Sequence, residues 1–159
     1  EQFVDECQVE SDLELLLPAT YVTGSSERML LYRELDSLTL DKDVEAFRNR
    51  LIDRFGPVPS ETEELLRIVP LRRLAARLGA EKVFLKGGRM SLFFISNPES
   101  PYYQSQAFGK VIAYMMKYTR RCDLREQNTR RSMLVKDVKN VETAVGVLQE
   151  IVAMQVEEG

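Results

Sequence analysis

Histidine is absent from the 159 residues of the chain. This absence removes the commonest general base, the Ser-His and Cys-His nucleophile systems, and most zinc sites. Phosphate-binding motifs are missing as well, because Gly87-Gly88 is followed by neither a GK[ST] ending nor a G-x-G-x-x-G pattern. We therefore expect no catalytic residue, no cofactor and no metal in this chain.

Cysteine is scarce, and long apolar runs are missing. Cys7 and Cys122 fit no CxxC or Cys/His spacing, which favours reduced thiols in a cytoplasmic protein over a disulfide. No run approaches the roughly 18 apolar residues of a membrane span, and the first residues, EQFVDECQVE, lack the blocks of a signal peptide. We expect a soluble cytoplasmic protein without membrane contact. Because Glu1 stands where a start methionine would, we also expect a piece of a longer polypeptide.

Charge is unevenly distributed along the chain, although the net charge is only −3. Residues 1–45 hold twelve acidic and three basic side chains, whereas residues 110–139 hold nine basic and three acidic ones. Either region could bind a partner, but solvated faces of opposite charge are the simpler interpretation. The acidic clusters at 41–45 and 61–64 lie at predicted helix starts, where carboxylates oppose the helix dipole. A catalytic carboxylate pair is therefore not indicated.

The clearest pattern in the chain is a predicted helix from Asp41 or Asp43 to Phe55. Its apolar residues recur on one face at the helical period, and they are Val44, Phe47, Leu51, Ile52 and Phe55. Gly56 can take a left-handed C-cap conformation, and the prolines that follow it forbid continuation of the helix. The opposite face is polar and should meet water or a partner.

A second amphipathic helix is predicted directly after this turn. Ser60 and Glu63 have the spacing of a capping box, and Gly79 closes the apolar pattern. Pro70 lies inside the run, where it removes a backbone donor and clashes with the preceding turn. We expect a kink at this proline or a break into two shorter helices near Val69.

The remaining patterns predict further strands and helices. In chain order they are a strand at 7–17, a short helix capped by Ser25 or Ser26, a hairpin of 83–85 and 90–95 around Gly87-Gly88, a helix at about 104–118, a second hairpin of 121–126 and 131–135, and a last helix beginning at Asp137 or Asn140. The strand at 90–95 should be central and covered on both sides. The fold class is α+β, a small mixed or antiparallel sheet with two hairpins packed against several amphipathic helices. We expect one domain over 1–159, with a frayed tail at 155–159.

One basic group suggests a nucleic-acid surface as an alternative function. It consists of Arg120, Arg121, Arg125, Arg130, Arg131 and Lys136, with Tyr114 and Tyr118 nearby in sequence. The low isoelectric point of about 5.2, the absence of a known binding motif and the helical placement of the tyrosines weigh against it.

Four segments together carry a resemblance to a known family. They are LPATYV at 17–22, ERMLLYREL at 27–35, LIDRFGPVP at 51–59 and LLRIVPLRRLAARLG at 65–79. In this order and spacing the chain resembles the C-terminal domain of bacterial transcription-repair coupling factors, from about Val9 to Met154. The DRFG turn and the LP-x-x-Y element are specific in combination and weak singly. After Gly79 the resemblance is one of pattern more than of residues.

The resemblance implies a regulatory role without an active site. In this family the parent protein is an ATP-driven DNA translocase, using ATP and Mg²⁺, that pushes stalled RNA polymerase off damaged DNA and recruits UvrA. The motor, the polymerase-contacting module and a UvrA-like module would precede this piece. The C-terminal domain packs on the UvrA-like module at rest, hides the surface that UvrA would bind, and is released when the motor engages.

A docking face follows from this resemblance as a hypothesis. Asn49, Arg50, Asp53 and Arg54 lie on the polar side of the first helix, and the turn at Gly56 forms the rim of the same surface. The alternative is that these charged residues only cap and solvate the helix end. Arg50 is basic where a carboxylate would better meet a basic partner.

Overall fold

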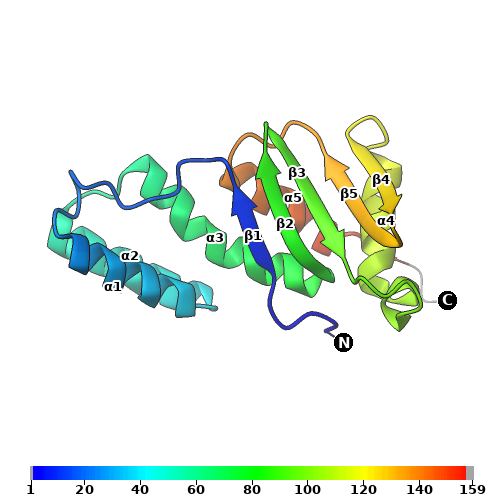
Figure 1. The fold of residues 1–159 in the computed structure, drawn as a ribbon, viewed down its shortest axis with the longest axis horizontal. Coiled ribbons are helices and arrows are strands. Elements are labelled where there is room, and N and C mark those ends of the chain that lie inside the picture. Colours follow the sequence, from blue (N-terminus) through cyan, green and yellow to red (C-terminus); the bar gives the residue numbers. More distant parts are fainter. Residues whose placement is uncertain (1, 157–159) are drawn as a thin grey trace. The chain divides into compact units, whose positions relative to one another are not determined.

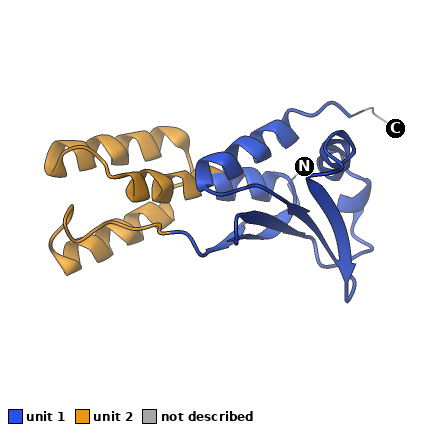
Figure 2. Ribbon diagram, turned by 90° about the horizontal axis from the view of Figure 1, so that it is seen from above, with its two compact units in different colours: residues 1–13, 71–159 blue, residues 14–70 orange. Residues whose placement is uncertain are grey.

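The computed structural model describes residues 2–156, and these form two compact units (Figure 2). Unit 1 contains residues up to 13 together with those from 71 onward, and unit 2 contains residues 14–70. The single-domain expectation stays a prediction, because two compact units can be parts of one domain.

Unit 1 is built on a five-stranded mixed sheet (Figure 1). Its strands are β1 (Gln8–Ser11), β2 (Ala80–Lys86), β3 (Arg89–Phe94), β4 (Cys122–Gln127) and β5 (Arg130–Val135), in the order β1-β2-β3-β5-β4. β1 runs parallel to β2, and the other neighbours are antiparallel. Together with the helices this confirms the predicted α+β class.

One face of the sheet is covered by the helices of unit 1. They are α4 (Gln106–Lys117), α5 (Val141–Val152) and the final turns of α3 (Ser60–Arg77), and a short 3-10 helix, η1 (Pro101–Gln104), precedes α4. The strand residues on that face are fully buried apolar side chains, among them Val83, Leu85, Met90, Leu92, Phe94, Met133 and Val135. Asn140 caps α5 by accepting a hydrogen bond from the Thr143 amide at 2.7 Å, as predicted.

Both predicted hairpins are confirmed, and each closes through two residues of positive φ. Gly87 and Gly88 have φ of 62° and 72° between β2 and β3. Asn128 and Thr129 have φ of 51° and 66° between β4 and β5. Two consecutive left-handed residues match the twist of the flanking strands, which is why such turns favour glycine and asparagine.

Unit 2 is helical and has its own core. It contains α1 (Ser25–Ser37), α2 (Asp41–Phe55) and the part of α3 up to Pro70. Its buried apolar residues are Leu17, Val22, Leu35, Phe47, Leu51, Leu66 and Val69. α3 is one continuous 18-residue helix with Pro70 inside it, so the predicted break into two helices is wrong.

The first predicted strand is much shorter than the sequence pattern suggested. The ladder ends at Ser11, whose hydroxyl accepts a hydrogen bond from the Leu13 amide and turns the chain. The apolar residues that follow serve unit 2 instead. The Thr62 hydroxyl of α3 donates to the Leu16 carbonyl oxygen at 2.8 Å, and the Leu17 amide donates to the Tyr32 hydroxyl at 2.7 Å.

Two predicted helix caps are wrong. Gly24 occupies the N-cap of α1 without a side-chain bond, so neither Ser25 nor Ser26 caps it. At the start of α3 the Glu63 amide donates to the Pro59 carbonyl oxygen, which makes Ser60 the first helical residue. The Glu63 carboxylate accepts a hydrogen bond from Arg48, so it does not close a capping box.

The strand predicted to be covered on both sides is central but covered on one side only. In β3, Met90, Leu92 and Phe94 are buried, whereas Arg89 is exposed and Phe93 is half-buried. Of the predicted tail, residues 157–159 lie outside the described part, and residues 155–156 have no regular structure. Within residues 2–156, no helix is long and apolar enough to cross a membrane, and no three His, Cys, Asp or Glu side chains are grouped to hold a metal.

Candidate docking site

The polar side of α2 lies on the surface of unit 2, as the sequence predicts. Phe47 and Leu51 are each 1% exposed and fix the inward face of the helix. Asn49, Arg50, Asp53 and Arg54 are all exposed on the outward side, and Gly56 is half-buried at the helix end. The structure thus brings the five predicted docking residues together on one end of α2.

Two of these residues are ion-paired to α1. Arg50 binds the Glu34 carboxylate through both terminal nitrogens, with 3.2 Å between Nη1 and Oε1. Arg54 pairs with the Glu27 carboxylate through one terminal nitrogen only. The hydrogen bond to Glu34 raises the pKa of Arg50 above its ordinary value. α1 therefore already satisfies much of the positive charge on this surface.

An apolar groove lies beside these arginines. It has a volume of about 130 Å³, and its lining consists of Leu31, Phe47, Arg50, Leu51, Arg54 and Phe55. The guanidinium carbon of Arg50 lies 5.5 Å from the Phe47 ring centroid, and that of Arg54 lies 4.8 Å from the Phe55 ring centroid. The guanidinium groups thus lie over an aromatic floor, and they offer a partner positive charge and a planar surface for stacking.

Asp53 differs from the arginines in that it forms no ion pair with any of the described residues. Arg48, five residues earlier in α2, is ion-paired with Glu63 at 2.8 Å. Asp53 is therefore the carboxylate on this surface that a basic partner can reach without displacing an internal partner.

The turn after α2 is held by contacts from two separate segments of the chain. Gly56 has φ of 90° and ψ of −163°, a conformation that side-chain-bearing residues avoid, and its amide donates to the Ile52 carbonyl oxygen. The Tyr21 hydroxyl donates to the Gly56 carbonyl oxygen at 2.8 Å, and its ring packs 5.6 Å from that of Phe55. The LP-x-x-Y element thus supports the DRFG turn.

Sequence reasoning missed the partners of the docking residues. Glu27 and Glu34 belong to α1, and Tyr21 belongs to the loop before it. No spacing rule links residues so far apart in sequence, because the contacts arise only when the helices pack. The sole available signal was the joint presence of both segments in the pattern that gave the family resemblance.

The basic group proposed as a nucleic-acid surface does not form one surface. Arg121 is bound by its own surroundings, donating to the Lys136 and Asp137 carbonyl oxygens and to the Tyr114 hydroxyl. Arg131 projects to the helix-covered side, where its guanidinium carbon lies 4.3 Å from the Tyr103 ring centroid.

The nearby tyrosines are also unsuited to stacking on bases. Tyr114 is fully buried, and the Tyr118 hydroxyl binds the Glu150 carboxylate. Arg120 is exposed in the turn after α4, apart from the sheet. Only Arg125, Arg130 and Lys136 of the predicted group share a face of the sheet, the one that the helices leave open.

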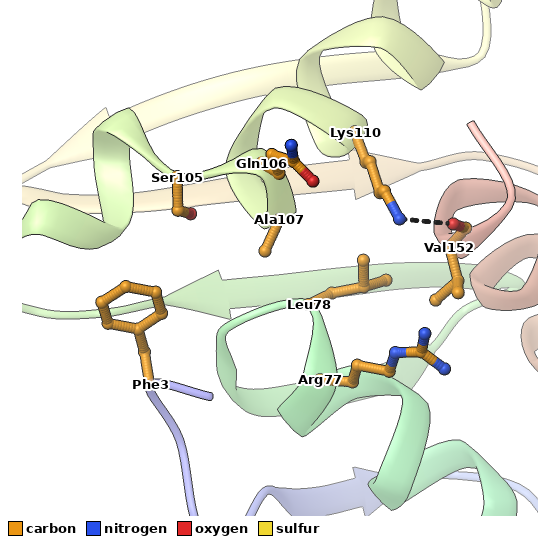
Figure 3. A pocket seen from close by; sticks show the side chains of 8 residues that line it. All are labelled: Phe3, Arg77, Leu78, Ser105, Gln106, Ala107, Lys110 and Val152. Carbon is orange, nitrogen blue, oxygen red and sulfur yellow. Dashed lines mark hydrogen bonds between the residues drawn. The ribbon is translucent and has the colours of Figure 1, made fainter. Parts of the chain in front are cut away.

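A larger cavity of about 350 Å³ lies in unit 1 (Figure 3). Its lining consists of Phe3, Arg77, Leu78, Ser105, Gln106, Ala107, Lys110 and Val152. The Lys110 ammonium donates to the Val152 carbonyl oxygen at 2.9 Å. The Ser105 hydroxyl accepts from the Phe108 amide and donates to the Tyr102 carbonyl oxygen, so it serves as the cap of α4.

Comparison with protein-family models identifies a match to the TRCF domain over residues 11–105. Curated relatives are transcription-repair-coupling factors. One from Rickettsia prowazekii is 27% identical over 138 residues, covering 86% of this chain and 12% of the relative. One from Rickettsia bellii is 28% identical over 116 residues, covering 73% of this chain and 10% of the relative. The chain thus spans about a tenth of the length of these relatives.

A solved structure supports the same fold. The crystal structure of the C-terminal domain of transcription-repair coupling factor matches with a TM-score of 0.71 and 17% identity. The match covers 92% of this chain and 93% of that one.

Proposed function

Because the chain belongs to the TRCF domain family, we propose that it is a non-catalytic regulatory domain of a transcription-repair coupling factor. At rest it docks on a UvrA-like module of the same protein and masks the surface that UvrA binds. It dissociates from this module when the ATP-driven motor engages. ATP, Mg²⁺, RNA polymerase and the DNA along which the motor moves are bound by other parts of the parent, which acts in the cytoplasm.

The observation that carries this proposal is the grouping of Asn49, Arg50, Asp53, Arg54 and Gly56 on one exposed end of α2. Asp53 offers a carboxylate to a basic partner. The arginines add donors over an aromatic floor, but each must share or exchange its carboxylate on α1. Surface ion pairs contribute only about 0.2–1 kcal/mol, so such an exchange costs little.

A largely polar surface suits a reversible clamp. A two-state switch operates with a few kcal/mol, and a ligand can shift it only by its differential affinity for the two states. Interfaces between domains of one chain are typically moderate and more polar than obligate ones. The end of α2 has this character, since it exposes four polar side chains, and two of them, Arg50 and Arg54, line a groove of about 130 Å³.

Charge reversal tests the docking face directly. Asp53→Arg with Arg54→Glu in the full-length protein should weaken masking and raise UvrA binding in the absence of ATP. Glu14→Arg with Lys42→Glu is the matched control, since both residues are exposed in unit 2 outside the proposed face. Unchanged UvrA binding in the Asp53/Arg54 variant removes these residues from the switch.

A second experiment tests the clamp as a whole. The 159-residue chain should capture the remainder of its parent protein without ATP and release it when ATP is added. If deletion of this domain leaves UvrA recruitment as restrained as before, the regulatory role itself is wrong.

A further inference from the structure

The face of the sheet that the helices leave open carries an unusual set of side chains. Among the described residues of unit 1, the helices lie on one side of the sheet only, as two views at right angles show (Figures 1 and 2). Strand pairing assigns the open-face residues. One row across the sheet is Gln8, Lys82, Phe93, Ser132 and Arg125, and the next is Glu10, Phe84, Ser91, Leu134 and Asp123.

Two aromatic rings occupy the middle of this face. Phe84 of β2 and Phe93 of β3 are both half-buried, and their ring centroids lie 5.5 Å apart at 79°. Each ring already has a cation near it. The Lys82 ammonium lies 4.5 Å from the Phe84 centroid, and the Arg130 guanidinium carbon lies 5.7 Å from the Phe93 centroid. When one face of a sheet packs on the core, the residues of the other face are usually polar. Packing in the core therefore does not explain two phenylalanines on the open face.

Cations surround the aromatic pair. Those on the open face are Lys82, Lys86, Arg89, Arg125, Arg130 and Lys136, and the carboxylates among them are Glu10, Asp12, Glu81 and Asp123. Six positive and four negative groups give this face a net charge of +2, whereas the chain as a whole carries −3. The face therefore attracts an anionic partner against the average charge of the protein.

We propose that this open face, termed the Phe84–Phe93 platform, binds single-stranded nucleic acid. Bases stack on Phe84 and Phe93, and the flanking lysines and arginines contact the phosphates. Aromatic rings on a sheet combined with a basic surround form a general solution for single strands, because every base has a π-face. A duplex would keep its bases stacked on one another and leave both rings uncovered.

The ion pairs on the platform do not prevent this. Lys82 pairs with Glu10 at 2.9 Å, and Arg130 pairs with Glu81 at 3.3 Å, with all four side chains about a third or more exposed. Exposed pairs of this kind are weak, so phosphates can replace the carboxylates as the partners of the cations. A base can likewise replace each cation over its ring. The platform belongs to unit 1, and its proposed role is independent of the docking proposed for α2.

The test measures fluorescence anisotropy of a labelled 12-nucleotide oligo-dT with the whole chain at about 50 and about 200 mM salt. Affinity should fall as salt rises, by about 0.7 in the log–log slope for each phosphate contacted. An oligomer of the same length with abasic sugars keeps the phosphates and lacks the bases. It should bind at least about fivefold more weakly, since stacking of one base corresponds to at least that factor.

Two double variants separate the contributions of rings and charges. Phe84→Leu with Phe93→Leu keeps apolar volume on the sheet and should lower oligo-dT affinity at least about fivefold. Lys82→Gln with Arg130→Gln should flatten the salt slope. Arg77→Gln with Lys117→Gln is the matched control, because it removes the same charge from the helix layer of unit 1 and should leave the slope closer to that of the unchanged chain.

Several outcomes overturn the proposal. They are absence of binding at 50 mM salt, equal affinity for the abasic oligomer, equal or tighter binding of a 12-base-pair duplex, and equal losses in the matched control and the Lys82/Arg130 variant. Tighter binding of a poly-glutamate peptide than of oligo-dT would assign the platform to an acidic protein segment instead. The abasic comparison uses the unchanged chain, so it decides the matter even if a variant fails to fold.

Discussion

The hydroxyl of Tyr21 lies 2.8 Å from the carbonyl oxygen of Gly56 and donates a hydrogen bond to it. This bond joins the loop before α1 to the turn after α2, at the rim of the proposed docking face. The shape of that rim therefore depends on a residue that is distant from it in sequence.

Replacement of Tyr21 by Phe should destabilise the protein by about 0.5–1.5 kcal/mol, since the ring remains but the hydrogen bond is lost. Burial raises the pKa of Tyr21, so the wild-type hydroxyl stays protonated and able to donate at neutral pH. Urea denaturation followed by circular dichroism measures the change. A midpoint equal to that of the unchanged chain would show that the bond contributes nothing to stability.

Two glycines should respond to alanine with opposite signs. Gly56→Ala places a side chain at φ of 90° and should cost about 1–3 kcal/mol, although no atom lies within 4 Å of the new methyl group. Gly146→Ala also meets open space, but within helix α5, and should stabilise by up to about 1 kcal/mol. Thermal unfolding of both variants checks the pair, and a loss of stability in both would contradict the argument from backbone conformation.

The pair of Arg50 and Glu34 should contribute a coupling energy of about 0.2–1 kcal/mol, because both side chains are substantially exposed. A double-mutant cycle with Arg50→Gln and Glu34→Gln measures it. The coupling should shrink at about 1 M salt, where the Debye length is about 3 Å. A coupling that is insensitive to salt would mean that the contact is not an ion pair in solution.

Neither thiol should react while the protein is folded. Cys7 and Cys122 are free and are 2% and 4% exposed, and burial raises the pKa of Cys7 to about 12. Thiolate is the reactive form, so a colorimetric thiol reagent at pH 8 should modify both residues only after denaturant is added. Ser26→Cys places a thiol at an exposed position and should react at once.

Stability should decline in acid partly through Glu150. The pKa of this carboxyl lies below its ordinary value of 4.5, mainly because the Tyr118 hydroxyl donates a hydrogen bond to it. The positive charge and hydrogen bond of Lys117 lower the pKa further. A carboxyl with a lowered folded-state pKa contributes stability above its unfolded pKa, and that contribution is lost as the pH falls below about 4.5. The free energy of unfolding, measured by denaturation at pH 7 and at pH 3, should therefore differ less between the two pH values for Glu150→Gln than for the unchanged chain.

A carboxylate without these partners serves as the control for this measurement. Glu99→Gln, in the exposed loop before η1, should leave the difference between pH 7 and pH 3 in place. An equal reduction in both variants would show that the acid sensitivity does not arise at Glu150.

The elements with strong local signals were predictable from the sequence. The apolar period from Val44 to Phe55 gave α2, and Gly87-Gly88 gave the first hairpin, because each signal depends on residues close together in the chain. Caps were less predictable. At the start of α3 the Glu63 amide donates to the Pro59 carbonyl oxygen, and the Glu63 side chain accepts a hydrogen bond from Arg48. The second contact depends on how α2 and α3 pack, which the local sequence does not show.

The candidate site was predictable only in part. The exposure of Asp53 and Arg54 follows from the helical period, but their environment does not. Which carboxylates meet Arg50 and Arg54 depends on how α1 lies along α2. The basic group around Arg120 to Lys136 illustrates the same limit, since the alternation of a strand sends neighbouring residues such as Arg130 and Arg131 to opposite faces of the sheet.

The pairing of β1 with β2 has a consequence for biosynthesis. Val9 lies beside Val83, so the whole of unit 2 must emerge from the ribosome before the first strand finds its neighbour. Until then β1 has no strand with which to pair, whereas the helices of unit 2 can already pack against one another. Loss of the first strand would leave β2 with a bare hydrogen-bonding edge, which invites self-association of chains.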